Sequence, residues 1–143
     1  MKHKLATALV SLAALAQSGA SFAQDARIPD LKGRWVGMSQ NIMLGTTVHH
    51  DAPHQGPRLS SLEFVITIEG QDGRRFWGNV TSSPAKKESV VGVISADGKM
   101  VVAQDADGLV QGSIVDQDTM DLIYSHANSK SSVAATLYMK RDK

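Results

Sequence analysis

The alternation of apolar and polar residues between Leu62 and Thr81 limits the fold more than any other feature of the sequence. An apolar residue occupies every second position at the start of this segment: Leu62, Phe64, Ile66 and Ile68. A period of two places these side chains on one face of a β-strand. Residues 70–73, Gly-Gln-Asp-Gly, predict a turn, because Asp and Gly adopt left-handed backbone conformations easily. Residues 74–81 return as a second strand, so a β-hairpin is expected.

The rest of the chain must extend this sheet, because a two-stranded hairpin is barely stable in water on its own. Six further segments show strand patterns, mostly separated by short turns: residues 31–39, 88–95, 99–105, 109–116, 119–126 and 131–141. Short connections join antiparallel neighbours. The pattern predicts an all-β fold, an eight-stranded antiparallel up-and-down (meander) barrel, in which closure removes the exposed edges. An open sandwich of two four-stranded sheets is the alternative.

Residues 1–23 have the features of a secretory signal peptide. A basic start that includes Lys2 and Lys4 precedes an apolar run rich in Ala and Leu, and Ser21 and Ala23 supply small residues before a cleavage point. The apolar run is shorter than the ~20 residues that a membrane-spanning helix needs. We therefore expect a periplasmic or secreted protein with no membrane span after signal cleavage, and a single β-barrel domain at residues 24–143.

The charge balance argues against two classes of partner. The 143 residues carry a formal net charge of +1, and removal of Lys2 and Lys4 leaves 13 basic against 14 acidic residues, a net charge of −1. Such a chain lacks the basic surface that binds nucleic acid or an anionic membrane. It also contains no cysteine, so its hydrophobic core must stabilise the domain without disulfides.

Three residues resemble the calycin arrangement of lipocalins and avidins. Gly33 and Trp35 form a Gly-x-Trp pattern on the first predicted strand, and Arg141 stands at the end of the last one. In those families the Trp lies at the floor of an eight-stranded barrel, and a basic residue from the last strand packs over it. The resemblance implies that Trp35 and Arg141 are neighbours, which requires the first and last strands to pair. A guanidinium over an indole is also favourable through the cation–π interaction.

The sequence departs from both of these families. Avidins place several tryptophans around biotin, whereas this chain has only Trp35 and Trp77. Lipocalins usually carry a helix after the barrel, for which this sequence shows no pattern. No ligand-contacting residue is therefore carried over from either family. The repeated Asp-Gly turns and the Phe76-x-Gly78 pattern are also similar to small exported bacterial barrels.

A long irregular stretch, residues 41–61, part of which can prolong the flanking strands, contains three closely spaced histidines: His49, His50 and His54. Imidazole suits zinc or copper, so a metal site is one hypothesis. Adjacent histidines in an extended segment point to opposite sides, so His49 and His50 would not easily share one ion. A solvated loop is therefore the alternative. Long loops are often functional, and this one is expected to form a lid or rim of the barrel.

The sequence carries no pattern that indicates catalysis. A nucleophilic site needs Ser, Thr or Cys beside a base that a third group holds in place. No Gly-x-Ser-x-Gly elbow, phosphate loop or dinucleotide motif occurs. His126 is the only histidine on a predicted strand and is expected at the rim. We therefore expect a non-catalytic protein without a cofactor, apart from the metal hypothesis.

The leading functional hypothesis is an exported barrel that binds a small, largely apolar molecule in its mouth. An eight-stranded barrel is either filled by its own side chains or just wide enough for one ligand. The expected contacts, in the interior or at the mouth, are Trp35, Phe64, Phe76, Tyr124 and Arg141. The alternative is a protein-interaction module, for example an exported hydrolase inhibitor. Trp77 and Tyr138 are expected on the outer face, which a homodimer or the 41–61 segment would cover.

Overall fold

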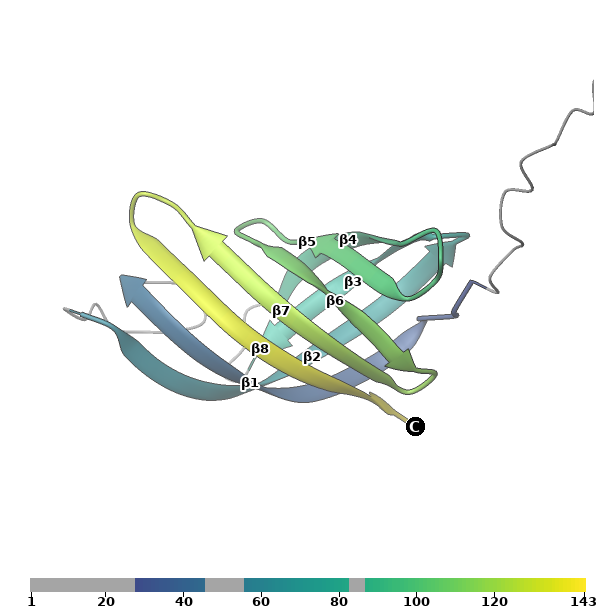
Figure 1. Ribbon diagram of the computed structural model, residues 1–143, viewed down its shortest axis with the longest axis horizontal. Helices are drawn as coiled ribbons and strands as arrows, with labels where there is room; N and C mark the ends of the chain where they lie inside the picture. The colour runs from purple at the N-terminus through teal and green to yellow at the C-terminus, as the bar shows by residue number, and fades with distance from the viewer. Residues whose placement is uncertain (1–27, 46–55, 83–86) are drawn as a thin grey trace, which may run out of the picture.

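The computed structural model describes residues 28–45, 56–82 and 87–143, and these form an antiparallel β-barrel (Figure 1). Its strands are β1 (Gly33–Gly45), β2 (Arg58–Asp72), β3 (Arg75–Ser82), β4 (Lys87–Ile94), β5 (Met100–Gln104), β6 (Leu109–Asp116), β7 (Thr119–Ala127) and β8 (Ser131–Asp142). Each strand pairs with the next, and β8 pairs with β1, so the wall is closed. The barrel prediction is confirmed, and the open sandwich is wrong.

The described residues contain no helix with the length and hydropathy to cross a membrane.

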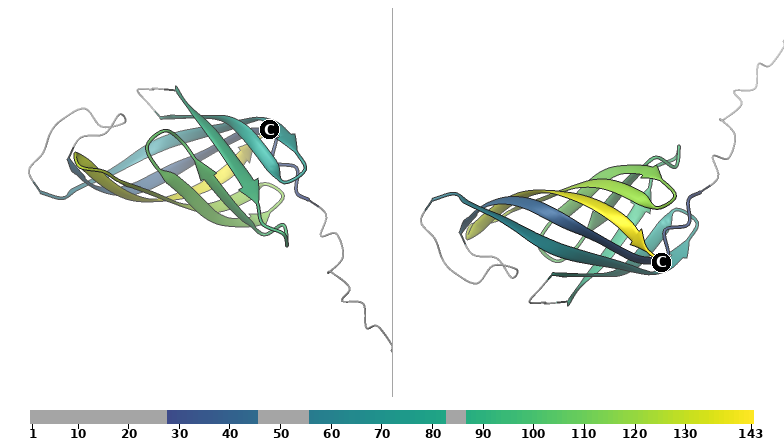
Figure 2. Two further views of the ribbon diagram at one scale, coloured as in Figure 1. Left: turned by 90° about the horizontal axis from the view of Figure 1, so that it is seen from above. Right: turned by 90° about the horizontal axis from the view of Figure 1, so that it is seen from below.

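The two ends of the barrel differ. At one end, here called the floor, lie the β2–β3, β4–β5 and β6–β7 turns together with residues 28–32. At the other end, the mouth, lie the β5–β6 and β7–β8 turns. Figure 2 shows that the C-terminus lies beside the start of the described chain, at the floor. The start of β1 and the end of β8 therefore lie side by side at the floor.

The seam between β1 and β8 closes the wall. Its register places Trp35 opposite Arg141 and Gly37 opposite Met139. A Cβ atom on Gly37 would lie 2.2 Å from the backbone oxygen of Tyr138 and 2.7 Å from the sulfur of Met139. The strands thus pack so closely that only glycine fits at this position, as expected where a barrel wall bends sharply.

The hairpin of β2 and β3 turns later than the sequence predicts. Residues 70–72 continue β2, and the turn is formed by Gly73 and Arg74 between the paired residues Asp72 and Arg75. The register shifts by one residue between Ile68 and Gly70, which is a β-bulge. Gly70 is needed for packing rather than for turning, because a Cβ atom there would lie 2.1 Å from the ring of Trp77.

The irregular stretch between β1 and β2 is shorter than the expected 41–61. β1 continues to Gly45 and β2 begins at Arg58. The inward side chains of Asn41 and Met43 are buried, whereas Ile42 and Leu44 point outward and are exposed. This alternation shows that the strand continues to Gly45. The alternation is hard to recognise in the sequence because much of the segment is polar. Residues 46–55 lie outside the described part of the chain.

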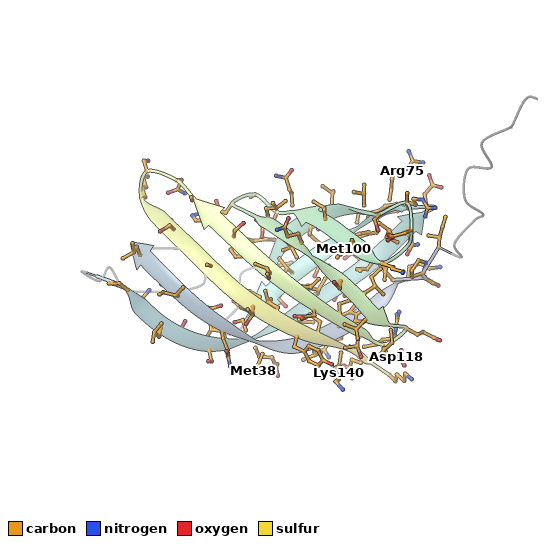
Figure 3. All side chains as sticks on the ribbon, in the orientation of Figure 1. Met38, Arg75, Met100, Asp118 and Lys140 are labelled. Atoms are coloured by element: carbon orange, nitrogen blue, oxygen red, sulfur yellow. The ribbon has the colours of Figure 1, made fainter. Side chains whose placement is uncertain are left out.

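The core fills the inside of the barrel. It consists of Leu31 of the preceding segment and apolar residues from every strand except β6, whose Val110 and Ile114 are partly buried against it: Leu31, Trp35, Ile66, Ile68, Phe76, Val90, Ile94, Val101, Ala103, Met120, Leu122, Ala135, Leu137 and Met139. The outer wall is more mixed. Figure 3 labels Met38 and Lys140, whose side chains project from the outer face of β1 and β8. Trp77 and Tyr138 are also outward and about half exposed, as predicted.

Candidate functional site

A cavity of about 70 Å³ lies within the barrel lumen and extends to the mouth. Most of its surface is apolar, with Phe64, Phe76 and Leu122 among the lining side chains. Polar residues also line it: Ser39, Asn41, Asp105, Asp107, Tyr124 and His126. Asp105 and Asp107 belong to the β5–β6 turn, so the polar lining reaches the mouth. The space suits a slender group of a few atoms and is well below the ~300 Å³ of a pocket for a drug-sized ligand.

The five residues expected to contact ligand separate into two groups. Phe64, Phe76 and Tyr124 line the cavity, as inward positions of β2, β3 and β7. Trp35 and Arg141 lie together at the floor and are not part of the cavity lining. The lumen thus brings together three of the residues, whereas the other two close its far end. Their contact with a ligand stays a prediction.

His126 organises the mouth. The side chain is buried, with 7% of its surface exposed. Its Nδ1 lies 2.9 Å from the carbonyl oxygen of Asp107, and its Nε2 lies 2.8 Å from Oγ of Ser131 and 3.2 Å from Nδ2 of Asn128. The carbonyl can only accept, so Nδ1 carries the proton and Nε2 accepts from Ser131 and Asn128. The ring therefore lies at the mouth end of the barrel, where it connects the β5–β6 turn to the β7–β8 turn.

Tyr124 lies beneath the β5–β6 turn. A Cβ atom on Gly108 would lie 2.5 Å from its hydroxyl oxygen, so the ring packs directly against the turn. Burial raises the pKa of Tyr124, and the negative charges of Asp105, Asp107 and Glu88 raise it further. The phenol is therefore protonated at neutral pH. Its hydroxyl adds a hydrogen-bonding group close to the mouth carboxylates.

Arg141 holds the floor together. Its guanidinium carbon lies 4.2 Å from the ring centre of Trp35. Nη1 donates to the carbonyl oxygen of Lys32 at 2.5 Å, and Nη2 donates to those of Asp30 at 2.8 Å and Gln117 at 3.1 Å. Trp35 in turn donates from Nε1 to the carbonyl oxygen of Leu31 at 2.9 Å. The pairing of Trp35 with Arg141 expected from the calycin resemblance is present.

Asp118 completes the floor network and makes it sensitive to acid. Its carboxylate lies 2.7 Å from Nζ of Lys143 and 3.2 Å from Nε of Arg141. The hydrogen bond from Lys143 lowers the pKa of Asp118 below its usual 3.8, and the charges of Lys143 and Arg141 lower it further, against a smaller effect of desolvation. A lowered pKa in the folded protein means that the ionised carboxylate stabilises the fold above pH 3.8. This contribution is lost as the pH falls through the folded-state pKa.

The variant Asp118→Asn is therefore expected to be less stable than the parent protein at neutral pH, and the difference in free energy of unfolding should shrink as the pH falls below about 4. Urea unfolding followed by circular dichroism at a series of pH values measures this. The control is Asp121→Asn, which changes an exposed carboxylate on the outer face of β7. An Asp118→Asn difference that stayed constant from neutral to acid pH would contradict the assignment.

A second hollow lies outside the floor. It is an open groove of about 650 Å³ between residues 28–31 and the β6–β7 turn. Its charged side chains include Asp30, Asp118, Arg141 and Lys143, which already pair within the floor and the adjoining segment. The groove is wide, but its charged side chains already form ion pairs and hydrogen bonds with one another or with the adjoining segment.

The histidines of the metal hypothesis, His49, His50 and His54, lie outside the described residues, so that hypothesis stays a prediction. Within the described ranges, no group of three or more His, Asp or Glu side chains is placed to hold a metal ion.

Comparison with known proteins gives no assignment: no family model, no curated protein and no solved structure matches this chain.

Proposed function

We propose that this protein is an exported, non-catalytic, calycin-like barrel that binds a small ligand by inserting a slender apolar group into the lumen from the mouth. The observation that carries the proposal is the cavity of about 70 Å³, which is mostly apolar and has most of its polar residues towards the mouth. Binding sites of this kind combine an apolar lining with a few polar groups that fix orientation. Export rests on the signal pattern of residues 1–23.

The size of the cavity restricts the ligand. Three or four heavy atoms of an alkyl chain fill such a space, so the remainder of the ligand would stay at the mouth. The β5–β6 turn and Tyr124 would contact that remainder. A bulky rigid ligand would require the lumen to widen, which a densely packed core resists.

A lumen-filling substitution tests the proposal. Ala135 is buried on β8 and lines the cavity, whereas its neighbour Ala134 points outward and is exposed. Ala135→Leu adds three carbon atoms to the lumen and is expected to weaken binding of 1-hexanol at least tenfold, whereas Ala134→Leu leaves it unchanged. An NMR titration with 1-hexanol measures both, since ligands of this size bind weakly.

Ala103→Leu repeats the substitution from β5, in case the first variant does not fold. Since each leucine enters existing space, a change in the free energy of unfolding of no more than about 1–3 kcal/mol is expected. Equal binding by the parent protein and both filled variants would contradict the lumen site.

The outer wall favours a second function, that of a protein-interaction module such as a hydrolase inhibitor. Trp77, Val91, Val93 and Val102 are exposed and lie on the adjacent strands β3, β4 and β5, where Trp77 pairs with Val91 and Val93 with Val102. An apolar face of this kind marks interaction surfaces. Native mass spectrometry of protein purified from its own cells separates the two functions, because it detects a retained small molecule, a bound protein or a second copy of this chain.

A further inference from the structure

Among the described residues that line the cavity, those with a charged side chain are both aspartates. Asp105 and Asp107 line the lumen cavity. Glu88 faces the same space, because it pairs with Val80, another residue of the cavity lining, and alternates with the buried Val90. Three carboxylates from β4 and the β5–β6 turn are thus directed to one opening.

The two aspartates are not neutralised by the described part of the chain. Other acidic residues, such as Asp72 and Asp142, pair with arginine, whereas no described Lys or Arg pairs with Asp105 or Asp107. Asp105 accepts the backbone N–H groups of Asp107 and Gly108 through Oδ1. These bonds hold its carboxylate in place, and no described Lys or Arg side chain pairs with its negative charge.

Within the described ranges, the basic residues near the mouth make no ion pair with either aspartate. Arg58 is at the first position of β2, where its Nη2 lies 3.2 Å from the sulfur of Met43. Lys130 is exposed on the β7–β8 turn. His126 is buried with both ring nitrogens hydrogen-bonded. The field at the cavity opening is also strong enough to contribute to the raised pKa of Tyr124, where all three carboxylates act in the same direction.

We infer that the ligand of the lumen has a positively charged head group, an alkylammonium or a related amine, that lies between the mouth carboxylates while its apolar tail enters the cavity. This inference rests on the proposed lumen site and adds the chemical class of the ligand. A carboxylate of the same length meets like charges at the mouth, and an alcohol of the same length gains no charge interaction there. The head group and the tail thus contribute separately to affinity.

Three probes of equal length test this inference on the full mature chain: hexylammonium, 1-hexanol and hexanoate. Each is titrated by NMR at low salt and again at 0.5 M sodium chloride. We expect hexylammonium to bind about fivefold to tenfold more tightly than hexanol, since partly exposed charge pairs have modest effects. Hexanoate should bind least tightly. The advantage of the amine should fall at high salt, because salt screens exposed charges.

Asp107→Asn removes one carboxylate with little change of shape and should reduce the preference for hexylammonium over hexanol by at least half. Asp105→Asn, which keeps an oxygen for the backbone bonds of the turn, should act in the same direction. Asp121→Asn on the outer wall is the matched control and should leave the preference unchanged.

Equal binding of hexylammonium and hexanol, or tighter binding of hexanoate, would overturn the assigned head group and leave the lumen site standing. Failure of all three probes to bind would overturn both the head group and the lumen site.

Discussion

Replacement of Trp35 by alanine is expected to lower the free energy of unfolding by about 3–5 kcal/mol, the usual cost of removing a large buried aromatic side chain. The Trp35 side chain is fully buried at the floor. The alanine variant loses three interactions at once: the packing of the indole against the core, the hydrogen bond from Nε1 to Leu31 and the contact with Arg141. Urea denaturation followed by far-ultraviolet circular dichroism measures the change.

Trp77→Ala is the matched control, because this second tryptophan is 47% exposed on the outer wall. Its ring packs against Gly70. We expect a loss of about 1 kcal/mol, in line with substitutions outside the core. If the two alanine variants had equal unfolding midpoints, Trp35 would not be the centre of the floor.

The architecture was predictable because a period of two fixes which residues face inward once the strand has been recognised. Closure was expected because eight antiparallel strands in order remove their exposed edges by closing. The calycin resemblance added the contact of Trp35 with Arg141, which the pairing of β1 with β8 provides. The turn of the first hairpin was not predictable in the same way. Gly70 and Gly73 fit a turn equally well by sequence, and only the ring of Trp77 against Gly70 shows why the first glycine stays within the strand.

The lining of the lumen cavity was predictable only in its apolar part. Phe64, Phe76 and Tyr124 stand out because large inward side chains of a barrel converge on its axis. Asp105 and Asp107 do not indicate a site, because Asp is an ordinary residue of turns. His126 was expected at the rim and is buried there, since its partners come from the turn residues Asp107 and Asn128 and from Ser131, the first residue of β8. The size of the cavity depends on many side chains together, so no single sequence pattern indicates it.

Replacement of Arg141 by alanine is expected to cost about 2–4 kcal/mol of unfolding free energy. Its side chain is only 17% exposed, and it donates to three backbone carbonyls while covering Trp35. Hydrogen bonds from a charged donor contribute about 1.5–3 kcal/mol each, and bonds that share one donor group are not additive. Arg141→Lys should recover less than half of the loss, because an ammonium lacks the planar fork and the stacking surface.

Arg34→Ala is the control that separates the effect of losing a mostly buried arginine from the effect of losing a positive charge. Arg34 pairs with Asp142 across the same seam of β1 and β8, but both side chains are about half exposed. An exposed ion pair contributes about 0–1 kcal/mol, so this variant should unfold close to the parent protein.

Hydrogen exchange adds a local measurement, because the carbonyls of Asp30 and Lys32 are held by Arg141. The loss of Arg141 should release residues 28–32 and speed exchange of the backbone N–H of Leu31, which now donates to Oε1 of Gln71. Slow exchange at Leu31 in Arg141→Ala, or equal stability losses for the Arg34 and Arg141 variants, would mean that β1 and β8 close the floor without the guanidinium. Closure of the floor would then depend on the side chains of Trp35 and Leu31 alone.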